Sequence, residues 1–301
     1  MSSGNQIAGV LPIVHTPFDD DDRIDHEVLK REIDWAFEQG ANGVCTGMVS
    51  EILRLTYDER IELTNKIVEF SAGRGVVVAS VGAECTKQAT GYARQADQAG
   101  CDAMMAIPPI STTLSNAEVL RYFEALANEV ELPLIVQDAS AYVGQAIDIE
   151  VQVKLLERYG RDKIMFKPEA SPIGPNLSAM RNRTEGKARV FEGSGGITLV
   201  DSFRRGIAGT MPGMDLLDGI VALWRALERG NDDEIYRLYF PICAIVALQL
   251  QAGLDGFLAI EKYILVKRGV FNNANRRQPN SWQLDEETAR EVDRLLEFMK
   301  I

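Results

Sequence analysis

Lys167 has the residue type and the setting of a group that reacts with a ketone. It ends a short apolar run and is followed by a proline, in the order Lys163-Ile164-Met165-Phe166-Lys167-Pro168. In a strand, alternate residues share a face, so Lys163, Met165 and Lys167 should point the same way. The proline favours extended geometry at Lys167 and ends the strand there. Loss of hydration disfavours an ammonium, so a lysine in such a place can supply the neutral amine that forms a Schiff base. The alternative is a lysine that reaches solvent or pairs with Glu169.

Three loops could bind the acidic end of a substrate. In Gly47-Met48-Val49-Ser50-Glu51, backbone N–H groups and a hydroxyl could bind a carboxylate, although an ordinary turn has the same composition. Gly193–Gly196 and Gly209–Gly213 are glycine-containing loops of the kind that bind phosphate in many barrels. The sequence alone leaves a keto-acid pocket and a phosphate site open.

Few other side chains suggest acid–base or metal chemistry. The only two histidines are His15 and His26. This argues against a zinc or other transition-metal centre, while an all-carboxylate magnesium site stays open. His15 could act as an acid or base, but the preferred interpretation is a packed, hydrogen-bonded side chain. Glu51 and Asp138 are expected to order loops rather than to perform chemistry.

The elements that must position these residues alternate between strands and helices. The candidate strands are short, apolar and rich in β-branched residues: Gly9–Val14, Gly43–Cys45, Val76–Val81, Ala103–Ile107, Leu134–Val136, Ile164–Lys167, Arg189–Phe191 and Ile207–Gly209. Between them the chain has helical periodicity, as in Val28–Phe37. The expected helix N-caps are Asp25, Thr56, Thr86 and Ser115. Eight such units predict an α/β protein with a closed (β/α)8 TIM barrel, the alternative being an open doubly wound sheet.

The last quarter of the chain has helices only. Apolar and helix-forming residues predict helices over Asp232–Leu250, Gly256–Lys267 and Glu286–Phe298. We therefore expect residues 1–228 to form the barrel that carries the active site. Residues 229–301 should form a C-terminal helical region that packs on the barrel or serves an oligomer interface.

Charge and composition narrow the classes of partner. The 301 residues include 32 basic and 44 acidic side chains, a formal net charge of -12. Such a surface repels nucleic acid and anionic lipid, and no uncharged apolar run reaches the roughly 20 residues that span a bilayer. The four cysteines have no paired spacing, and the N-terminus lacks the pattern of a signal peptide. These features predict a cytoplasmic protein with no nucleic-acid or membrane partner.

The chain resembles the dihydrodipicolinate synthase / N-acetylneuraminate lyase family of pyruvate-type aldolases. The matching pieces occur in family order: Gly9–Pro12 with Thr16-Pro17-Phe18, Gly47–Glu51 with Leu55–Arg60, Pro108-Pro109, Phe166–Ser171 and Gly206–Gly209. The resemblance implies a barrel with a helical tail, a Schiff-base lysine at Lys167, no cofactor and a homotetramer built from two dimers. It also implies that the loops after the seventh and eighth strands line a keto-acid pocket.

The departures from the family pattern point to one branch. The usual loop Gly-Thr-Thr-Gly-Glu has Met48, Val49 and Ser50 in its middle, and the proton-shuttling tyrosine is replaced by Gln137. Ser111 stands at the tyrosine pair after the double proline, and Tyr142 stands where an arginine is expected. Gln137 cannot transfer protons as a phenol does. The Gln-Asp-Ala strand end resembles 2-keto-3-deoxy sugar-acid dehydratases.

These observations predict a lyase, aldolase or dehydratase, that acts on a small 2-keto acid, most simply a 2-keto-3-deoxy sugar acid. The expected catalytic residues are Lys167 and Gln137. The expected substrate-binding residues are Val49, Ser50, Ser111, Tyr142, Gly193 and Met211. Four alternatives stay open: condensation of pyruvate with an aldehyde, a non-catalytic keto-acid-binding barrel, a phosphate-binding isomerase, and carbon–carbon cleavage in place of water loss.

Overall fold

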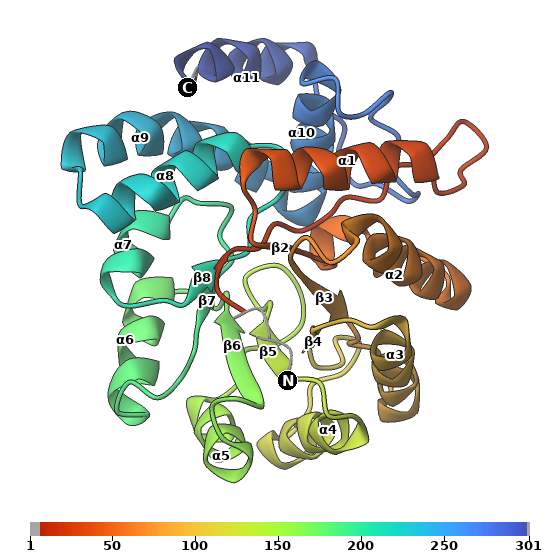
Figure 1. Ribbon diagram of the computed structural model, residues 1–301, viewed down its shortest axis with the longest axis vertical. Coiled ribbons are helices and arrows are strands. Elements are labelled where there is room, and N and C mark those ends of the chain that lie inside the picture. Colours follow the sequence, from red (N-terminus) through yellow and green to blue (C-terminus); the bar gives the residue numbers. More distant parts are fainter. Residues whose placement is uncertain (1–6, 300–301) are drawn as a thin grey trace.

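The computed structural model describes residues 7–299 and forms a parallel (β/α)8 barrel (Figure 1). The eight strands are β1 (Gly9–Val10), β2 (Gly43–Cys45), β3 (Val76–Ser80), β4 (Ala103–Ala106), β5 (Leu134–Asp138), β6 (Ile164–Pro168), β7 (Phe191–Glu192) and β8 (Gly209–Thr210). Ladders run β2-β3-β4-β5-β6 and β1-β8-β7. Parallel bridges from Ile13 to Cys45 and from Phe166 to Val190 join the two sets, so the barrel closes. The predicted fold class is confirmed.

Eight helices alternate with the strands and surround the barrel in Figure 1. They are α1 (His26–Gln39), α2 (Tyr57–Ser71), α3 (Thr86–Ala99), α4 (Asn116–Glu129), α5 (Ile149–Tyr159), α6 (Ile173–Arg183), α7 (Leu199–Arg204) and α8 (Leu217–Arg229). Side-chain oxygens of Asp25, Thr56 and Ser115 cap α1, α2 and α4 as expected. The expectation for Thr86 is wrong, because Cys85 is the N-cap of α3 and Thr86 is its first helical residue.

The strands are predicted least accurately where the barrel closes. The first strand was expected over Gly9–Val14 but its ladder ends at Val10, and Ile13 forms only single bridges to Cys45 and Gly213. Pro12 has no N–H group to continue a ladder, which accounts for the break. The seventh and eighth strands lie one to two residues later than expected, at Phe191–Glu192 and Gly209–Thr210.

Side chains inside the barrel form a core of their own. Leu11, Ile13, Cys45, Val78, Met105, Ile135, Met165 and Phe191 belong to this inner cluster, whereas a larger cluster fills the space between strands and helices. Met165 therefore points into the barrel, as the alternation along β6 predicts. At the opposite end of that strand, Lys163 Nζ donates to the backbone carbonyl of Leu132 at 2.9 Å. Its neighbour on the same face, Lys167, points inward at the mouth.

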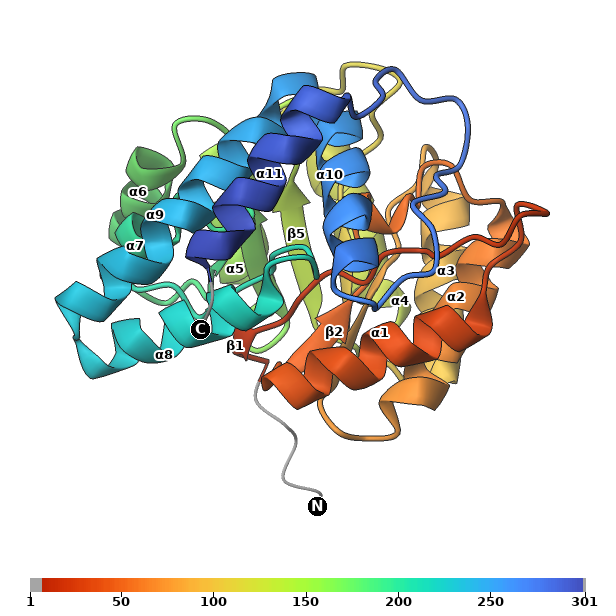
Figure 2. The ribbon, with the colours of Figure 1, turned by 90° about the horizontal axis from the view of Figure 1, so that it is seen from above.

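The C-terminal region consists of α9 (Asp232–Gln249), a 3-10 turn η2 (Leu250–Ala252), α10 (Gly253–Lys267) and α11 (Glu286–Phe298). The last helix has the expected bounds, and α10 begins three residues earlier than expected. Figure 2 shows α9, α10 and α11 together on the side of the barrel where α1 and α8 lie. Asp232–Lys267 is long and apolar enough to pass a length-and-composition test for a membrane span, but half of its most apolar window is buried in the fold. We attribute its apolar character to packing on the barrel.

Candidate active site

Lys167 lies at the carboxyl end of β6, where barrel enzymes place catalytic groups. It pairs in register with Gln137 of β5, so the two predicted catalytic residues are neighbours across the ladder. The lysine is only 3% exposed. Its side chain borders a cavity of about 40 Å³ at the mouth of the barrel.

The buried amine has one acidic neighbour. Lys167 Nζ lies 3.4 Å from Glu169 Oε1, and Gln137 Nε2 donates to Glu169 Oε2 at 2.6 Å. Burial raises the pKa of Glu169, and the positive charge of Lys167 and the amide of Gln137 oppose that rise. The ion pair between Lys167 and Glu169, which is one alternative for this lysine, therefore exists. It lies inside the cavity rather than in solvent. An amine beside a buried carboxylate suits imine formation followed by proton transfer.

Gly193 follows β7 directly, and because it has no side chain there is space beside it for Lys167 and Glu169. A Cβ at this position would lie 2.3 Å from Lys167 Cε and 2.5 Å from Glu169 Oε1. Both distances are far below van der Waals contact, so no larger residue fits there without moving the lysine or the glutamate. The glycine-containing loop after β7 is thus fitted to side chains rather than only to a ligand.

Six of the eight predicted site residues line the cavity. They are Val49, Gln137, Tyr142, Lys167, Gly193 and Met211. Ser50 is buried behind the loop, where its Oγ accepts from the N–H of Gly47 at 3.0 Å and donates to the carbonyl of Val14. Ser111 is exposed, and its N–H donates to Glu84 Oε2 at 3.0 Å. A substrate-binding role for these two serines remains a prediction, since neither is among the lining residues.

Tyr142 brings a hydroxyl to the cavity from the loop after β5. Its ring packs edge-to-face on Phe257 of α10, with 5.8 Å between ring centroids. Burial raises the pKa of Tyr142, and the carboxylates of Glu169, Glu192 and Glu261 raise it further. The phenol consequently stays protonated near neutrality and can donate a hydrogen bond to a substrate oxygen.

The C-terminal region supplies a wall that the sequence interpretation did not foresee. Leu254, Phe257 and Glu261 of α10 line the same cavity as Lys167. The barrel thus carries Lys167, but the C-terminal helices do more than pack on it, because α10 supplies part of the cavity wall. The available signal was the adjacent pair Glu261-Lys262 in the middle of an otherwise apolar helix, because charged residues are rarely buried without a specific partner.

Lys262 and Glu51 tie α10 to the loop after β2. Both are buried, and Lys262 Nζ donates to Glu51 Oε1 as well as to the carbonyl of Thr16 at 2.8 Å. Glu51 Oε2 accepts from the N–H of Arg277 at 2.8 Å. Burial lowers the pKa of Lys262, and the charge of Glu51 opposes that effect. Glu51 therefore orders the loop, as expected.

Asp138 and His15 also match their expected structural roles, Asp138 as a residue that orders a loop and His15 as a packed, hydrogen-bonded side chain. Asp138 accepts from the N–H groups of Ser140 at 3.0 Å and Ile147 at 2.8 Å, which fixes the loop after β5. His15 is fully buried between two carboxylates, with Nδ1 3.2 Å from Glu32 Oε1 and Nε2 2.7 Å from Glu261 Oε2. It is packed and hydrogen-bonded rather than open to the cavity.

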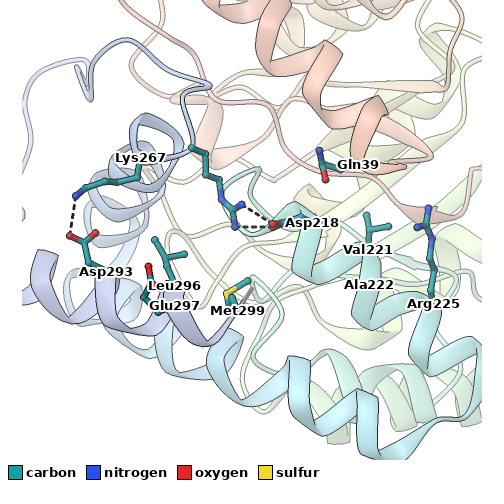
Figure 3. Close-up of a pocket in the computed structure, with 11 residues that line it drawn as sticks. Gln39, Asp218, Val221, Ala222, Arg225, Lys267, Asp293, Leu296, Glu297 and Met299 are labelled. Carbon is teal, nitrogen blue, oxygen red and sulfur yellow. Dashed lines mark hydrogen bonds and ion pairs between the residues drawn. The ribbon is translucent and has the colours of Figure 1, made fainter. Parts of the chain in front are cut away.

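A second hollow, shown in Figure 3, shares no lining residue with the cavity at Lys167. It measures about 800 Å³ and is bordered by residues of α8, α10 and α11. Ion pairs border it, between Arg268 and Asp218 at 2.7 Å and between Lys267 and Asp293 at 3.0 Å. None of the predicted site residues lies there. Among residues 7–299, no cluster of histidine, cysteine and carboxylate side chains is arranged to hold a metal ion.

Comparison with known proteins agrees with the barrel fold and identifies the family. The sequence pattern of the Dihydrodipicolinate synthetase family matches residues 6–297. The chain is 28% identical over 245 residues to an L-2-keto-3-deoxyarabonate dehydratase from Azospirillum brasilense, covering 79% of this chain and 78% of the relative. It is also 28% identical over 244 residues to a 4-hydroxy-tetrahydrodipicolinate synthase from Methanosarcina mazei, covering 79% and 81% of the two chains. A prophage protein of this family from E. coli K12, solved in complex with pyruvate, superposes with a TM-score of 0.87 at 22% identity, covering 98% and 99% of the two chains.

Proposed function

The chain is a lyase of the dihydrodipicolinate synthetase family, and we propose that it removes water from a 2-keto-3-deoxy sugar acid through an imine at Lys167. The observation that carries this proposal is the buried Lys167 amine, which borders the mouth cavity 3.4 Å from Glu169. A nucleophile and a proton acceptor are thereby held side by side on one strand end.

The proposed chemistry proceeds in four steps. The Lys167 amine attacks the C2 ketone, water leaves, and an iminium forms. The iminium withdraws electrons from C3, so the Glu169 carboxylate can take a C3 proton and leave an enamine. The enamine electrons then expel the C4 hydroxyl, which departs as water after gaining a proton. Hydrolysis of the unsaturated iminium restores the amine and releases an unsaturated 2-keto acid, so the substrate loses one water overall.

Two features support dehydration over condensation. Gln137 stands where a condensing enzyme of the family has its tyrosine, and an amide cannot shuttle protons to a second substrate. In addition, the Azospirillum relative carries the name of a dehydratase. Gln137 here donates to Glu169 at 2.6 Å, which holds the proposed base toward the lysine.

Condensation of pyruvate with an aldehyde is the second candidate. It is favoured by the name of the Methanosarcina relative, whose identity to this chain is also 28%. Both candidates share the imine at Lys167 and differ in what happens to the enamine. The carbon–carbon bond formed in this case would appear as a larger product from pyruvate and an aldehyde.

We also propose that the protein is a cytoplasmic homotetramer made of two dimers. All four cysteines are free thiols, which suits a reducing compartment. The exposed apolar side chains Phe240, Leu250 and Phe298 on the C-terminal helices offer surface for association. Light scattering coupled to size-exclusion chromatography tests the assembly.

Borohydride trapping tests the proposed function. The protein is incubated with L-2-keto-3-deoxyarabonate or pyruvate, reduced with borohydride and mapped by peptide mass spectrometry, while NMR identifies the products. We expect an adduct on Lys167 with either acid and water loss from the first. Lys167→Met should give neither adduct nor product, and Lys154→Met, an exposed lysine of α5, is the matched control. Absence of an adduct with both acids would remove the imine mechanism.

A further inference from the structure

A second carboxylate borders the cavity, on the wall built by the C-terminal region. Glu261 of α10 lines it together with Lys167 and Glu169. Although the residue is only 2% exposed, no lysine or arginine is paired with Glu261 in the described part of the chain, and its partner is the imidazole of His15. The buried Glu261 carboxylate therefore depends on His15 for compensation of its charge. The four-step chemistry above assigns it no function.

His15 holds Glu261 from behind. Its Nε2 lies 2.7 Å from Glu261 Oε2, and its Nδ1 lies 3.2 Å from Glu32 Oε1 on α1. The backbone N–H of His15 also donates to Glu32 Oε1 at 2.9 Å, which fixes the imidazole in place. The chain Glu32–His15–Glu261 thus runs from the buried face of α1 to the cavity wall, like an oriented acid–base group with two supporting residues.

A third carboxylate lies beside Glu261. A Cβ placed on Gly213 would lie 2.4 Å from Glu261 Oε1 and 3.0 Å from Asp215 Oδ1, so both oxygens flank the same glycine. Asp215 Oδ2 in turn accepts from Gln249 Nε2 at 2.8 Å. The carboxyl groups of Glu32, Glu261 and Asp215 and the imidazole of His15 therefore form one cluster. All four side chains are buried from solvent. Such groups share protons, because their charges cannot all be present at low cost.

We infer that Glu261 is a second catalytic residue, the acid that gives a proton to the departing C4 hydroxyl, with His15 and Glu32 as its positioning residues. This inference rests on the proposed dehydration. In the elimination step the enamine electrons break the C4–O bond while the O–H bond of the Glu261 carboxyl breaks and its proton joins the hydroxyl. Water and a Glu261 carboxylate result. The His15 Nε2–H group stabilises that carboxylate, and a proton from Asp215 restores the acid. Asp215 regains a proton from solvent, while Glu169 gives up the C3 proton to solvent, so the cycle closes.

The charges around the cluster place its protons at rest on His15 and Asp215, because the Glu261 carboxylate favours protonation of both. Glu261 therefore acts as the acid after the Asp215 side has passed it a proton. Burial opposes protonation of His15, but the hydrogen bonds and charges of Glu261 and Glu32 outweigh it and raise the pKa of His15 to about 10. Burial first, and then the charge of Glu261, raise the pKa of Asp215 to about 7, against His15 and Arg268. Burial also raises the pKa of Glu32, against His15 and Lys262. The cluster accordingly carries transferable protons near neutral pH.

The inference also gives Glu169 and Glu261, the two carboxylates that line the cavity, separate catalytic roles. Glu169, beside the amine, takes the C3 proton, and Glu261, on α10, serves the C4 hydroxyl. Both line the cavity with Tyr142, and the charges of both raise the pKa of its phenol. An enzyme that only exchanges C3 protons needs the first carboxylate and not the second. This difference makes the inference testable apart from the imine.

Two reactions of Glu261→Gln test the separation. Exchange of the pyruvate methyl protons with D2O, followed by NMR, reports the imine and Glu169 only. Dehydration of L-2-keto-3-deoxyarabonate reports all groups. We expect proton exchange within about threefold of the unaltered protein and dehydration slowed by roughly 10²–10⁴-fold, the range of general acid catalysis. Glu169→Gln should slow both reactions, and Glu185→Gln, an exposed matched change after α6, should slow neither.

A substrate whose leaving group needs no proton separates catalysis from structure. With 4-fluoro-2-oxobutanoate, fluoride departs unaided, so Glu261→Gln should release fluoride at a rate close to that of the unaltered protein. Glu261→Leu, which removes the carboxylate and keeps a side chain of similar size, should show the same pattern if Glu261→Gln folds poorly. Unimpaired dehydration by both variants, or equal loss of exchange, fluoride release and dehydration, would overturn the inference. Failure of the proposed function would appear differently, as no trapped adduct in the unaltered protein.

The positioning residues have a pH readout of their own. Glu32→Gln removes one charge that keeps His15 protonated, so the alkaline limb of the dehydration rate should move to lower pH, whereas the pH profile of proton exchange should not move. The other charged and titratable groups around the cluster, namely Asp215, Arg268, Lys262 and Tyr142, are unaltered in this variant. An unchanged dehydration profile in folded Glu32→Gln would contradict the positioning role.

Discussion

The Lys167 amine and the Glu169 carboxylate lie 3.4 Å apart inside the barrel mouth, two residues from each other along the chain. Pro168 separates them and ends the strand, and the N–H of Glu169 donates to the carbonyl of Asp138 at 2.8 Å. The backbone therefore turns so that both side chains reach one cavity. Lys167 could therefore form the proposed imine and Glu169 could remove the proton without the movement of a loop.

The first prediction concerns the pH dependence that Glu169 creates. Burial raises its pKa, and it must be ionised to accept a proton, so activity should rise with pH as Glu169 loses its own proton. The acid limb of kcat/KM should lie above the pH expected for an ordinary glutamate. Glu169→Gln should remove that limb and lower kcat by roughly 10²–10⁴-fold. A limb that persists in this variant would assign it to another group.

The second prediction concerns the glycine after β7. Gly193→Ala should reduce imine trapping and turnover by at least about 10²-fold, because a displacement of reacting groups by an ångström has that effect. The new methyl group would lie 2.3 Å from Lys167 Cε. The matched control is Gly91→Ala on α3, where the nearest atom to a new Cβ is 3.5 Å away. That change should leave turnover intact and stabilise the helix by up to about 1 kcal/mol. Equal activities of the two variants would contradict the packing argument.

The third prediction concerns the buried pair of Lys262 and Glu51. Lys262→Met leaves Glu51 with a buried, partly unpaired charge, and this should lower the free energy of unfolding by roughly 3–5 kcal/mol. Adding Glu51→Gln should restore part of the loss, because the uncompensated charge disappears. Urea denaturation of both single variants and the double variant measures this coupling. If the two losses simply add, the pair is not coupled.

The fourth prediction concerns stability at alkaline pH. Folding raises the pKa of His15 from 6.5 to about 10, so the folded state favours the protonated form. The stabilisation is complete below pH 6.5 and disappears as the pH rises through about 10. Over that window the free energy of unfolding should fall by up to about 1.4 kcal/mol per pH unit more in the unaltered protein than in His15→Gln. Parallel curves for the two proteins would show that His15 releases no proton on unfolding there.

Local sequence pattern was sufficient to predict the barrel and the place of Lys167 at its mouth, whereas its proposed reactivity rests on the family resemblance. Strand–helix alternation predicts the parallel sheet, and Lys167 is recognisable because the apolar run and Pro168 mark both its direction and its strand end. The pattern was weaker at β1, β7 and β8, where strands of two residues are too short to show alternation.

Contacts between distant parts of the chain could not be read in the same way. Glu261 contacts His15, which lies 246 positions away in the sequence, and no local periodicity predicts such a contact. The bond from the N–H of Ser111 to Glu84 of the preceding loop is likewise a contact that the motif alone does not reveal. Gly193 was chosen as a ligand-binding residue, and its close fit to Lys167 became visible only in three dimensions.

The wall formed by α10 has a consequence for how the protein is made. Leu254, Phe257 and Glu261 lie in the last sixth of the chain, so a ribosome must translate nearly all of it before the cavity has all its sides. Until then, Lys167 of the nascent barrel lies in a cavity that is open on the side that α10 later covers. Newly synthesised enzyme should gain turnover abruptly, late in translation, rather than in proportion to the length completed.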